Sequence, residues 1–251
     1  MSMFHVMHAV FLRDMRSRFF NHGIGFLVVS LWPLVHMLVL LLVNTAMGRR
    51  APYGDDMLLF LTTGLIPTLA FMYVSRFMAM SLLMNRPMMA FPVVHAVDIL
   101  LARAFLEIIA AAITLFLALC ILIMLGSNVI PNDLSDAVFA YLATILFAIG
   151  MGILAGVLAM CFEIFITIYF ILMILVYISS GSLFVLSSLP EFVARPLSWL
   201  PVVQSVEWMR VAYYPTYSSE YLDRSYFVLV GLCSLALGLA LERIVRQRLM
   251  E

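Results

Sequence analysis

Lysine is missing from this 251-residue chain, so arginine supplies every basic side chain other than histidine. A phosphate-binding P-loop needs a lysine that reaches the β- and γ-phosphates of the nucleotide. The chain therefore cannot be a conventional P-loop ATPase, and if ATP drives its activity, another polypeptide binds the ATP and Mg²⁺. It also has no His-Glu-x-x-His zinc motif and no Gly-x-Ser-x-Gly nucleophile elbow, so we expect no catalytic residue, no metal site and no bound cofactor.

Charged residues are scarce as well, at 11% of the chain, and the formal net charge is zero. A net charge of zero gives no general attraction to nucleic acid, so we exclude a nucleic-acid partner. Hydrophobic residues make up 65% of the chain, and the mean hydropathy is +1.11. These values exclude a water-soluble fold and predict an integral membrane protein of the helical type, surrounded by lipid.

The chain has only three cysteines, and each lies in an apolar stretch: Cys120, Cys161 and Cys233. Their spacing is not that of metal ligands, so we interpret them as small packing residues without a disulfide. Ionisable side chains are also rare in the apolar stretches, where an ion-coupled carrier would place them. His36 is the main candidate for such a carrier site, although a hydrogen bond to a neighbouring helix also explains it. Glu107 follows Arg103 by one helical turn, which predicts a structural ion pair.

Six segments contain the roughly 20 mostly apolar residues that a helix needs to cross the hydrocarbon core of a bilayer. They run over residues 24–47, 57–80, 101–125, 137–160, 164–186 and 226–242. The run from Gly23 to Met47 is too long for the apolar core of a cleaved signal peptide, so we interpret it as an uncleaved span. The sequence predicts an all-α integral membrane fold, with residues 1–251 forming a single transmembrane domain of six helices.

Arginines are divided unequally between the two sides of these spans. An even number of spans places both termini on one side, and cytoplasmic loops carry an excess of arginine. With cytoplasmic termini, nine arginines lie inside: Arg13, Arg16, Arg18, Arg76, Arg86, Arg103, Arg243, Arg246 and Arg248. The other five lie outside: Arg49, Arg50, Arg195, Arg210 and Arg224. The imbalance predicts a multi-pass protein with both termini in the cytoplasm.

Residues 1–22 have the spacing of an amphipathic helix. Five apolar side chains fall on one face: Phe4, Met7, Phe11, Met15 and Phe19. Arg13 and Arg16 point elsewhere, so the pattern predicts an interfacial helix in the headgroup layer with its arginines directed away from the lipid. The stretch FLRDMRSRFF contains three arginines, Arg13, Arg16 and Arg18. These arginines either fix only the orientation of the chain or also bind a partner.

Two connections are more than simple loops. Residues 81–100 are interrupted by Pro87 and Pro92 and are rich in polar side chains, which predicts a short cytoplasmic helix between two breaks. It is either a connector or, with the N-terminal arginines, a docking surface. Residues 187–225 contain four prolines and many aromatic residues. They are too interrupted to span and too apolar for a solvated loop, which predicts broken re-entrant helices in the outer leaflet before the last span.

At these residues the chain resembles the membrane subunits of ABC-2 type exporters, in particular the permeases that export capsular polysaccharide. The resemblance covers nearly the whole chain and rests on five stretches in order: FLRDMRSRF, GIGFLVVSLWPLVHMLVLL, GLIP at 64–67, NRPMMAFPVVHAVDILLARAFLE and SWLPVVQSVEWMRVAYYPTY. The chain departs from the family pattern at two places. Leu200 precedes Pro201 where related permeases often have asparagine, and the turn around Phe162 and Glu163 lacks a basic residue.

The resemblance implies half of a transporter in the inner membrane. Two copies of the permease form a homodimer and pair with two copies of an ATP-binding subunit, which binds the ATP and Mg²⁺. A lipid-linked capsular or related polysaccharide then passes through a continuous channel between the permeases, and envelope-spanning export proteins are a further class of partner. In this family the N-terminal helix and the 81–100 connection face the ATPase, which implies a coupling role for these residues: Arg13, Arg16, Arg18, Asn85, Arg86 and Asp98.

The resemblance also implies that the broken segment before the last span forms an outer gate. Five of its residues are the candidates for this gate: Trp199, Trp208, Arg210, Tyr213 and Tyr214. Its aromatic rings either form an interfacial belt or contact the substrate. With so few charges in the spans, we expect aromatic, methionine and hydroxyl side chains to line the channel, and four residues are candidates: Trp32, Phe71, Tyr73 and Tyr177.

Two other functions remain open at this point. An ABC-2 exporter of a small lipid or a drug would have the same spans, although the aromatic-rich outer segment favours a glycan because flat rings stack on sugar faces. A membrane scaffold that transports nothing would have the same composition. The sequence does not identify the glycan or its lipid anchor.

Overall fold

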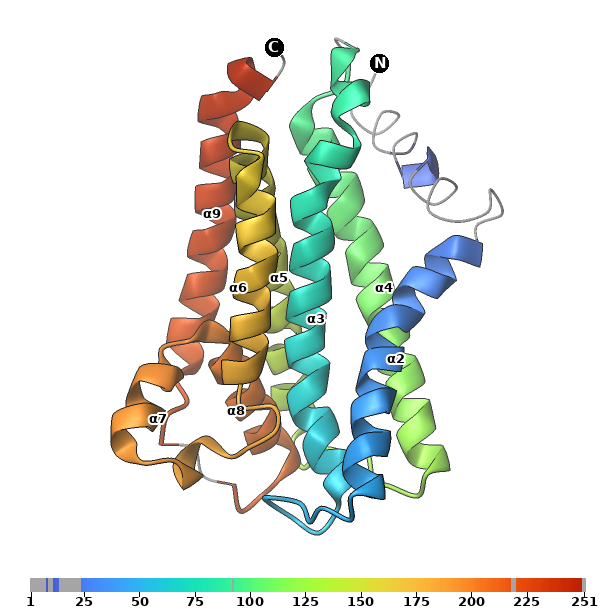
Figure 1. Ribbon diagram of the computed structural model, residues 1–251, viewed down its shortest axis with the longest axis vertical. Helices are drawn as coiled ribbons and strands as arrows, with labels where there is room; N and C mark the ends of the chain where they lie inside the picture. The colour runs from blue at the N-terminus through green and yellow to red at the C-terminus, as the bar shows by residue number, and fades with distance from the viewer. Residues whose placement is uncertain (1–7, 9–10, 14–23, 92, 218–219, 250–251) are drawn as a thin grey trace.

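A computed structural model describes residues 8, 11–13, 24–91, 93–217 and 220–249, and within these ranges the chain forms helices and no strand (Figure 1). The long helices are α2 (Ile24–Ala46), α3 (Met57–Met84), α4 (Ala96–Met124), α5 (Leu134–Cys161), α6 (Ile164–Ser179) and α9 (Arg224–Leu249). Four shorter elements connect them: η1 (Arg86–Ala90), η2 (Leu186–Ser188), α7 (Glu191–Ser198) and α8 (Pro201–Tyr213).

Four of the described helices are long and apolar enough to cross a membrane: α3, α4, α5 and the Arg224–Val245 part of α9. The apolar stretches Leu31–Ala46 of α2 and Ile164–Ser179 of α6 are shorter. A helix pairs its own backbone N–H and C=O groups, as a hydrocarbon environment requires. The helical character expected from the composition is therefore confirmed.

The long helices lie side by side and alternate in direction (Figure 1). Figure 1 shows α3 between α6 and α2, and α5 packs most extensively against α9 and α3. One end of the bundle carries η1 and the turn at 162–163, and we call it the η1 end. The opposite end carries α7, α8 and the connections 47–56 and 125–133, and we call it the α8 end. Asp56 and Asp133 cap the N-termini of α3 and α5 at this second end.

Glycines on α5 let its backbone approach α3 closely. A Cβ atom added at Gly152 would lie 2.8 Å from the Ser75 carbonyl oxygen, and one added at Gly156 would lie 3.1 Å from that of Ala79. Glycines four residues apart share one helix face, and small residues of this kind allow close helix contact in membranes. Gly64 likewise lets α3 approach the backbone of Ser182, whose carbonyl oxygen would lie 2.7 Å from an added Cβ.

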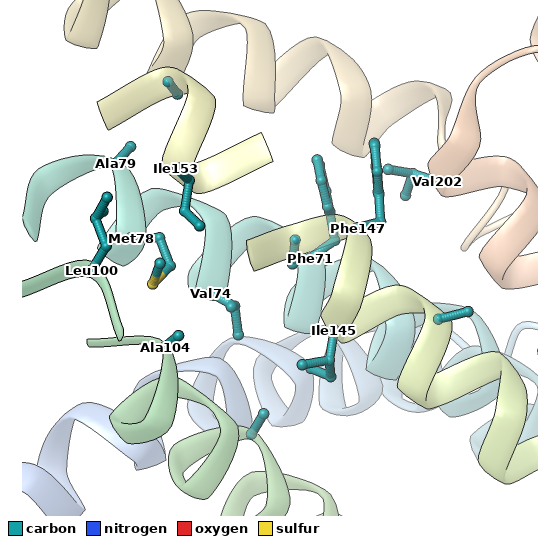
Figure 2. Close-up of a cluster of buried hydrophobic side chains, with 14 of the residues drawn as sticks. Phe71, Val74, Met78, Ala79, Leu100, Ala104, Ile145, Phe147, Ile153 and Val202 are labelled. Atoms are coloured by element: carbon teal, nitrogen blue, oxygen red, sulfur yellow. The ribbon is translucent and has the colours of Figure 1, made fainter. Parts of the chain in front are cut away.

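Apolar side chains pack between α3 and its neighbours α4 and α5 (Figure 2). Phe71 of α3 stacks on Phe147 of α5, with ring centroids 4.8 Å apart and planes 9° from parallel. Figure 2 shows these two rings together, and Met78 and Ala79 of α3 near Ile153 of α5. This core holds α3 and α5 together along most of their length.

Several element boundaries differ from the sequence-based expectations. The helix α6 ends at Ser179, before residue 186, because the Ser180 hydroxyl donates to the Tyr177 carbonyl and Gly181 adopts a φ of +78°. The helix α3 continues to Met84 and α4 begins at Ala96, so the connection between them comprises residues 85–95. Most of the predicted N-terminal helix lies outside the described residues, so its amphipathic character remains a prediction.

Candidate functional site

The segment between α6 and α9 folds into two short helices at the α8 end (Figure 1). The helices α7 and α8 contain 8 and 13 residues, which is too few to cross a bilayer. Pro201 occupies the first turn of α8, where its missing N–H costs no hydrogen bond, and this proline separates the two helices. The predicted break in the segment is therefore observed.

Arg210 attaches α8 to the rest of the bundle. Its side chain has no solvent exposure, and its guanidinium donates to the carbonyl oxygens of Phe184 at 2.8 Å and Ser182 at 3.1 Å. It also lies 4.2 Å from the centroid of the Phe60 ring and 3.8 Å from the Glu207 carboxylate. A buried charge needs partners of this kind, so Arg210 links α8 both to α3 and to the turn that follows α6.

A tyrosine stabilises the acidic partner of this pair. The Tyr217 hydroxyl donates to both carboxylate oxygens of Glu207, at 2.9 and 3.0 Å. Burial, together with the charge of Glu207, raises the pKa of Tyr217, so the phenol keeps its proton and remains a donor. The Tyr53 ring packs edge-on against Tyr214 and Tyr217, at 5.4 and 4.9 Å between centroids. The cluster therefore connects α8 to the 47–56 connection.

Gln204 holds the two ends of the segment together. Its amide nitrogen donates to the carbonyl oxygens of Ser198 at 2.6 Å and Tyr221 at 2.7 Å, and its amide oxygen accepts from the Asp223 backbone N–H at 2.7 Å. Because one side chain bonds both to the end of α7 and to the chain before α9, α7 and α8 are braced as a unit.

The five predicted gate residues occupy different environments. Trp208 and Arg210 are buried, and the Trp208 indole N–H donates to Asp136 at 3.0 Å. Tyr213 and Tyr214 are half-buried, and burial raises the pKa of Tyr214 to about 12. Trp199 is 70% exposed. Buried side chains support the segment, so among these five Trp199 offers the largest free surface.

A group of polar and aromatic side chains lies where α2, α3 and α6 meet. The His36 Nδ1 atom is 3.4 Å from the Tyr73 hydroxyl, and the His36 ring centroid is 5.5 Å from that of Tyr177. Trp32 is 62% exposed and precedes His36 by four residues, so both lie on one face of α2. We call Trp32, His36, Tyr73 and Tyr177 the aromatic face. The sequence analysis gave His36 two explanations, a carrier site or a hydrogen bond to a neighbouring helix, and its contact with Tyr73 of α3 fits the second.

Phe71, the fourth channel candidate, lies elsewhere. It is 2% exposed and packs in the core against Phe147, on the side of α3 that contacts α5. Its neighbour Tyr73 instead reaches His36 on α2. The structure therefore brings Tyr73 and Tyr177 together around His36, with Trp32 on the same face of α2, and places Phe71 apart from them.

Two parts of the predicted docking surface meet at the η1 end. The Arg13 guanidinium donates to the Asn85 side-chain oxygen at 3.1 Å, and the Asn85 amide donates to the Ser81 carbonyl at 3.0 Å. The Phe11 ring lies 5.7 Å from that of Phe105 on α4. The described N-terminal residues therefore contact both α4 and the 85–95 connection, whereas Arg16 and Arg18 lie outside the described residues.

The remaining coupling candidates differ in exposure. Asp98 is buried and accepts from the His95 backbone N–H at 3.1 Å, which caps the N-terminus of α4. Arg86 is exposed and lies 3.9 Å from Glu163 in the turn between α5 and α6. The sequence analysis missed Glu163 as a partner, because no local pattern links residues this far apart. Arg86 and Glu163 together offer charges at the η1 end.

A buried ion pair lies within α4. Arg103 and Glu107 approach to 2.6 Å and are almost fully buried, which confirms the predicted ion pair. Within the described ranges, no group of three or more His, Cys, Asp and Glu side chains is placed to hold a metal ion.

Three known proteins resemble this chain over nearly its whole length, while no protein-family model matches it. The polysialic acid transport protein KpsM of Escherichia coli is 30% identical, and the match covers 94% of this chain and 91% of KpsM. The capsule polysaccharide export inner-membrane protein CtrC of Neisseria meningitidis is 28% identical, and the match covers 94% of this chain and 89% of CtrC. The capsule polysaccharide export inner-membrane protein BexB of Haemophilus influenzae is 23% identical, and the match covers 95% of this chain and 90% of BexB.

Proposed function

This chain belongs to the family of capsule polysaccharide export inner-membrane proteins, and we propose that it is the permease subunit of an ATP-driven exporter. Its substrate is a capsular or related polysaccharide, carried on a lipid, that crosses the inner membrane. The observation that carries this proposal is similarity to polysaccharide exporters over 94% of the chain. The absence of lysine supports a separate ATP-binding subunit, which binds the ATP and Mg²⁺.

In this proposal the chain crosses the membrane six times. The four long helices supply four crossings, and α2 and α6 supply the other two. The 16 residues of α6 extend for about 24 Å, so the turn that Arg210 holds completes this crossing. The excess of arginine at the η1 end supports a cytoplasmic location for that end and for both termini.

The aromatic face supports a place for the transport pathway. Trp32, Tyr73 and Tyr177 present flat rings on the side of the bundle formed by α2, α3 and α6, and His36 adds a polar atom. Aromatic rings stack on sugar faces, and neutral hydrogen-bonding groups suit a hydroxyl-rich chain. Two copies of the permease that meet through this side would enclose a continuous channel. We leave Phe71 out of this pathway because it is buried in the core.

The η1 end supports an attachment site for two copies of the ATP-binding subunit. Arg13 uses one donor on Asn85, and a guanidinium has five, so further bonds to a partner are available. Arg86 and Glu163 add exposed charges of both signs. At the opposite end, α7 and α8 form the outer gate, with Trp199 as its most exposed aromatic residue. Envelope-spanning export proteins would receive the polysaccharide there.

Deletion of the gene for this chain, followed by localisation of the polysaccharide, tests the proposed function. We expect polysaccharide to accumulate inside the cell and to return to the surface when the intact chain is supplied from a plasmid. Normal surface polysaccharide in the deletion strain would contradict the proposal. If a small lipid accumulates inside while the polysaccharide remains at the surface, the lipid-exporter alternative replaces it.

A further inference from the structure

A long groove runs between α4 and α5. It consists of two hollows of about 500 and 590 Å³. The two hollows share four of their lining residues: Leu115, Leu119, Tyr141 and Leu142. The hollows are therefore adjacent along these residues.

The groove exists because α5 packs elsewhere. Although α4 and α5 follow each other in the chain, α5 makes its extensive contacts with α3 and α9. One hydrogen bond bridges the two helices along the groove, from the Tyr141 hydroxyl of α5 to the Ala111 carbonyl of α4 at 2.9 Å. The helices are thus linked at one point and separated beside it.

The walls of the groove have the chemistry of a hydrocarbon. The polar side chains of its α3 wall are bonded to backbone carbonyls within the protein, since Thr62 donates to Leu58 at 2.7 Å and Thr63 donates to Phe60 at 2.8 Å. Tyr141 is likewise bonded to Ala111. An ordered water needs two to four polar partners, so this groove favours an apolar occupant.

The groove is open to the surrounding lipid and has the length of an acyl chain. It follows α4 from Ile108 to Leu122, and a helix of that length extends for about 21 Å. One leaflet of the hydrocarbon core is about 15 Å thick, so the groove is long enough to hold an acyl chain of one leaflet. Along its edges Phe116 is 66% exposed and Leu142 is 57% exposed, which leaves it accessible from the side.

We propose that this groove retains one acyl chain of a phospholipid from the surrounding bilayer. A partner helix is a poorer occupant, because helices meet in membranes through small residues, whereas Phe116, Leu119 and Leu142 are bulky. A flexible alkyl chain can follow the space between such side chains. The α8 end of the groove is bounded by Met209 and Tyr213, so the retained lipid contacts the proposed outer gate. This inference does not depend on the identity of the exported molecule.

Photocrosslinking in nanodiscs tests the proposal. The full chain is reconstituted in phosphatidylethanolamine and phosphatidylglycerol with a trace of phosphatidylethanolamine that carries a diazirine in mid-chain, and the labelled residues are mapped by mass spectrometry. We expect labelling per residue at Leu115 and Leu119 to exceed that at Leu232 and Leu237 on α9 by about tenfold, equivalent to roughly 1.4 kcal/mol of preference. Leu232 and Leu237 are 49% and 61% exposed and represent ordinary lipid contact.

A substitution that fills the groove provides the control. Ala112 lines it and is exposed, so Ala112→Trp should remove the excess labelling, whereas Ala236→Trp at an exposed position on α9 should leave it unchanged. Size-exclusion chromatography checks that both variants remain folded. If Ala112→Trp does not fold, Leu142→Trp takes its place. Equal labelling of α4 and α9 would overturn the proposal. So would a molecule with the mass of the transport substrate retained in the groove.

Discussion

At the residue scale, Arg210 brings a positive charge into the α8 end with no solvent exposure. Transfer of a lone charge out of water is costly, and the two carbonyl oxygens, Glu207 and the Phe60 ring offset that cost. Burial lowers the pKa of Arg210, but arginine stays charged at any physiological pH. Removal of the guanidinium would leave Glu207 buried without its cation.

We therefore predict that Arg210→Leu destabilises the protein by about 3–5 kcal/mol and abolishes export. The matched control is Arg195→Leu, which breaks an exposed pair with Glu191 and should cost less than about 1 kcal/mol. Thermal unfolding of the purified proteins in detergent measures the difference. Equal thermal midpoints for the two variants would show that the buried network does not stabilise the α8 end.

At the element scale, α3 presents different faces to its neighbours. Residues two apart on a helix point in nearly opposite directions, so Phe71 faces α5 while Tyr73 faces α2 and α6. The chemistry differs accordingly. The face toward α5 is an apolar core, and the other carries the Tyr73 hydroxyl, which meets the His36 imidazole of α2.

Alanine substitutions at the aromatic face and in the α3–α5 core should affect different properties, export in the first case and stability in the second. We predict that Trp32→Ala and Tyr73→Ala slow export while the protein remains in the membrane with its stability little changed. Phe71→Ala should instead cost roughly 3–5 kcal/mol by opening a cavity, and less protein should reach the membrane. Quantitative blotting of membranes, with an export assay on the same cells, separates the two effects. Loss of the Trp32 and Tyr73 variants from the membrane would assign those residues to packing.

At the scale of the whole molecule, the proposed exporter would receive its energy through contact with a separate ATP-binding subunit, because the chain has no P-loop. Arginine suits that contact, since its fork of donors binds carboxylates and carbonyls and remains charged. The contact between Arg13 and Asn85 joins the described N-terminal residues to the 85–95 connection, so both belong to one surface. Lipid headgroups compete for the same arginines, at about 1 kcal/mol per contact.

We predict that the double substitution Arg16→Glu and Arg18→Glu weakens association of the ATP-binding subunit and abolishes export. The topology should remain, because Arg76, Arg86 and Arg103 still mark the cytoplasmic side. The control reverses two C-terminal arginines, Arg246 and Arg248, which changes the charge of the same side equally. Co-purification of the ATP-binding subunit measures the association. Full recovery with normal export would leave Arg16 and Arg18 with a role in orientation alone.

The sequence by itself determined the features that depend on local chemistry. Long apolar runs form helices in lipid whatever their neighbours are, because a helix satisfies its own backbone. The pair of Arg103 and Glu107 was predictable because one helical turn separates them. Prolines in the segment between α6 and α9 likewise indicated the break that the structure contains.

Only the tertiary structure decided which face of each helix packs and which remains open. In a soluble protein a polar stripe marks the outside, but lipid is as apolar as a protein core, so a membrane helix carries little such signal. The sequence therefore placed Phe71 and Tyr73 together, and the fold separated them. It also gave no indication that Arg210 turns inward, that Arg86 meets Glu163, or that a groove opens between α4 and α5. These contacts join residues far apart in the chain, so packing alone creates them.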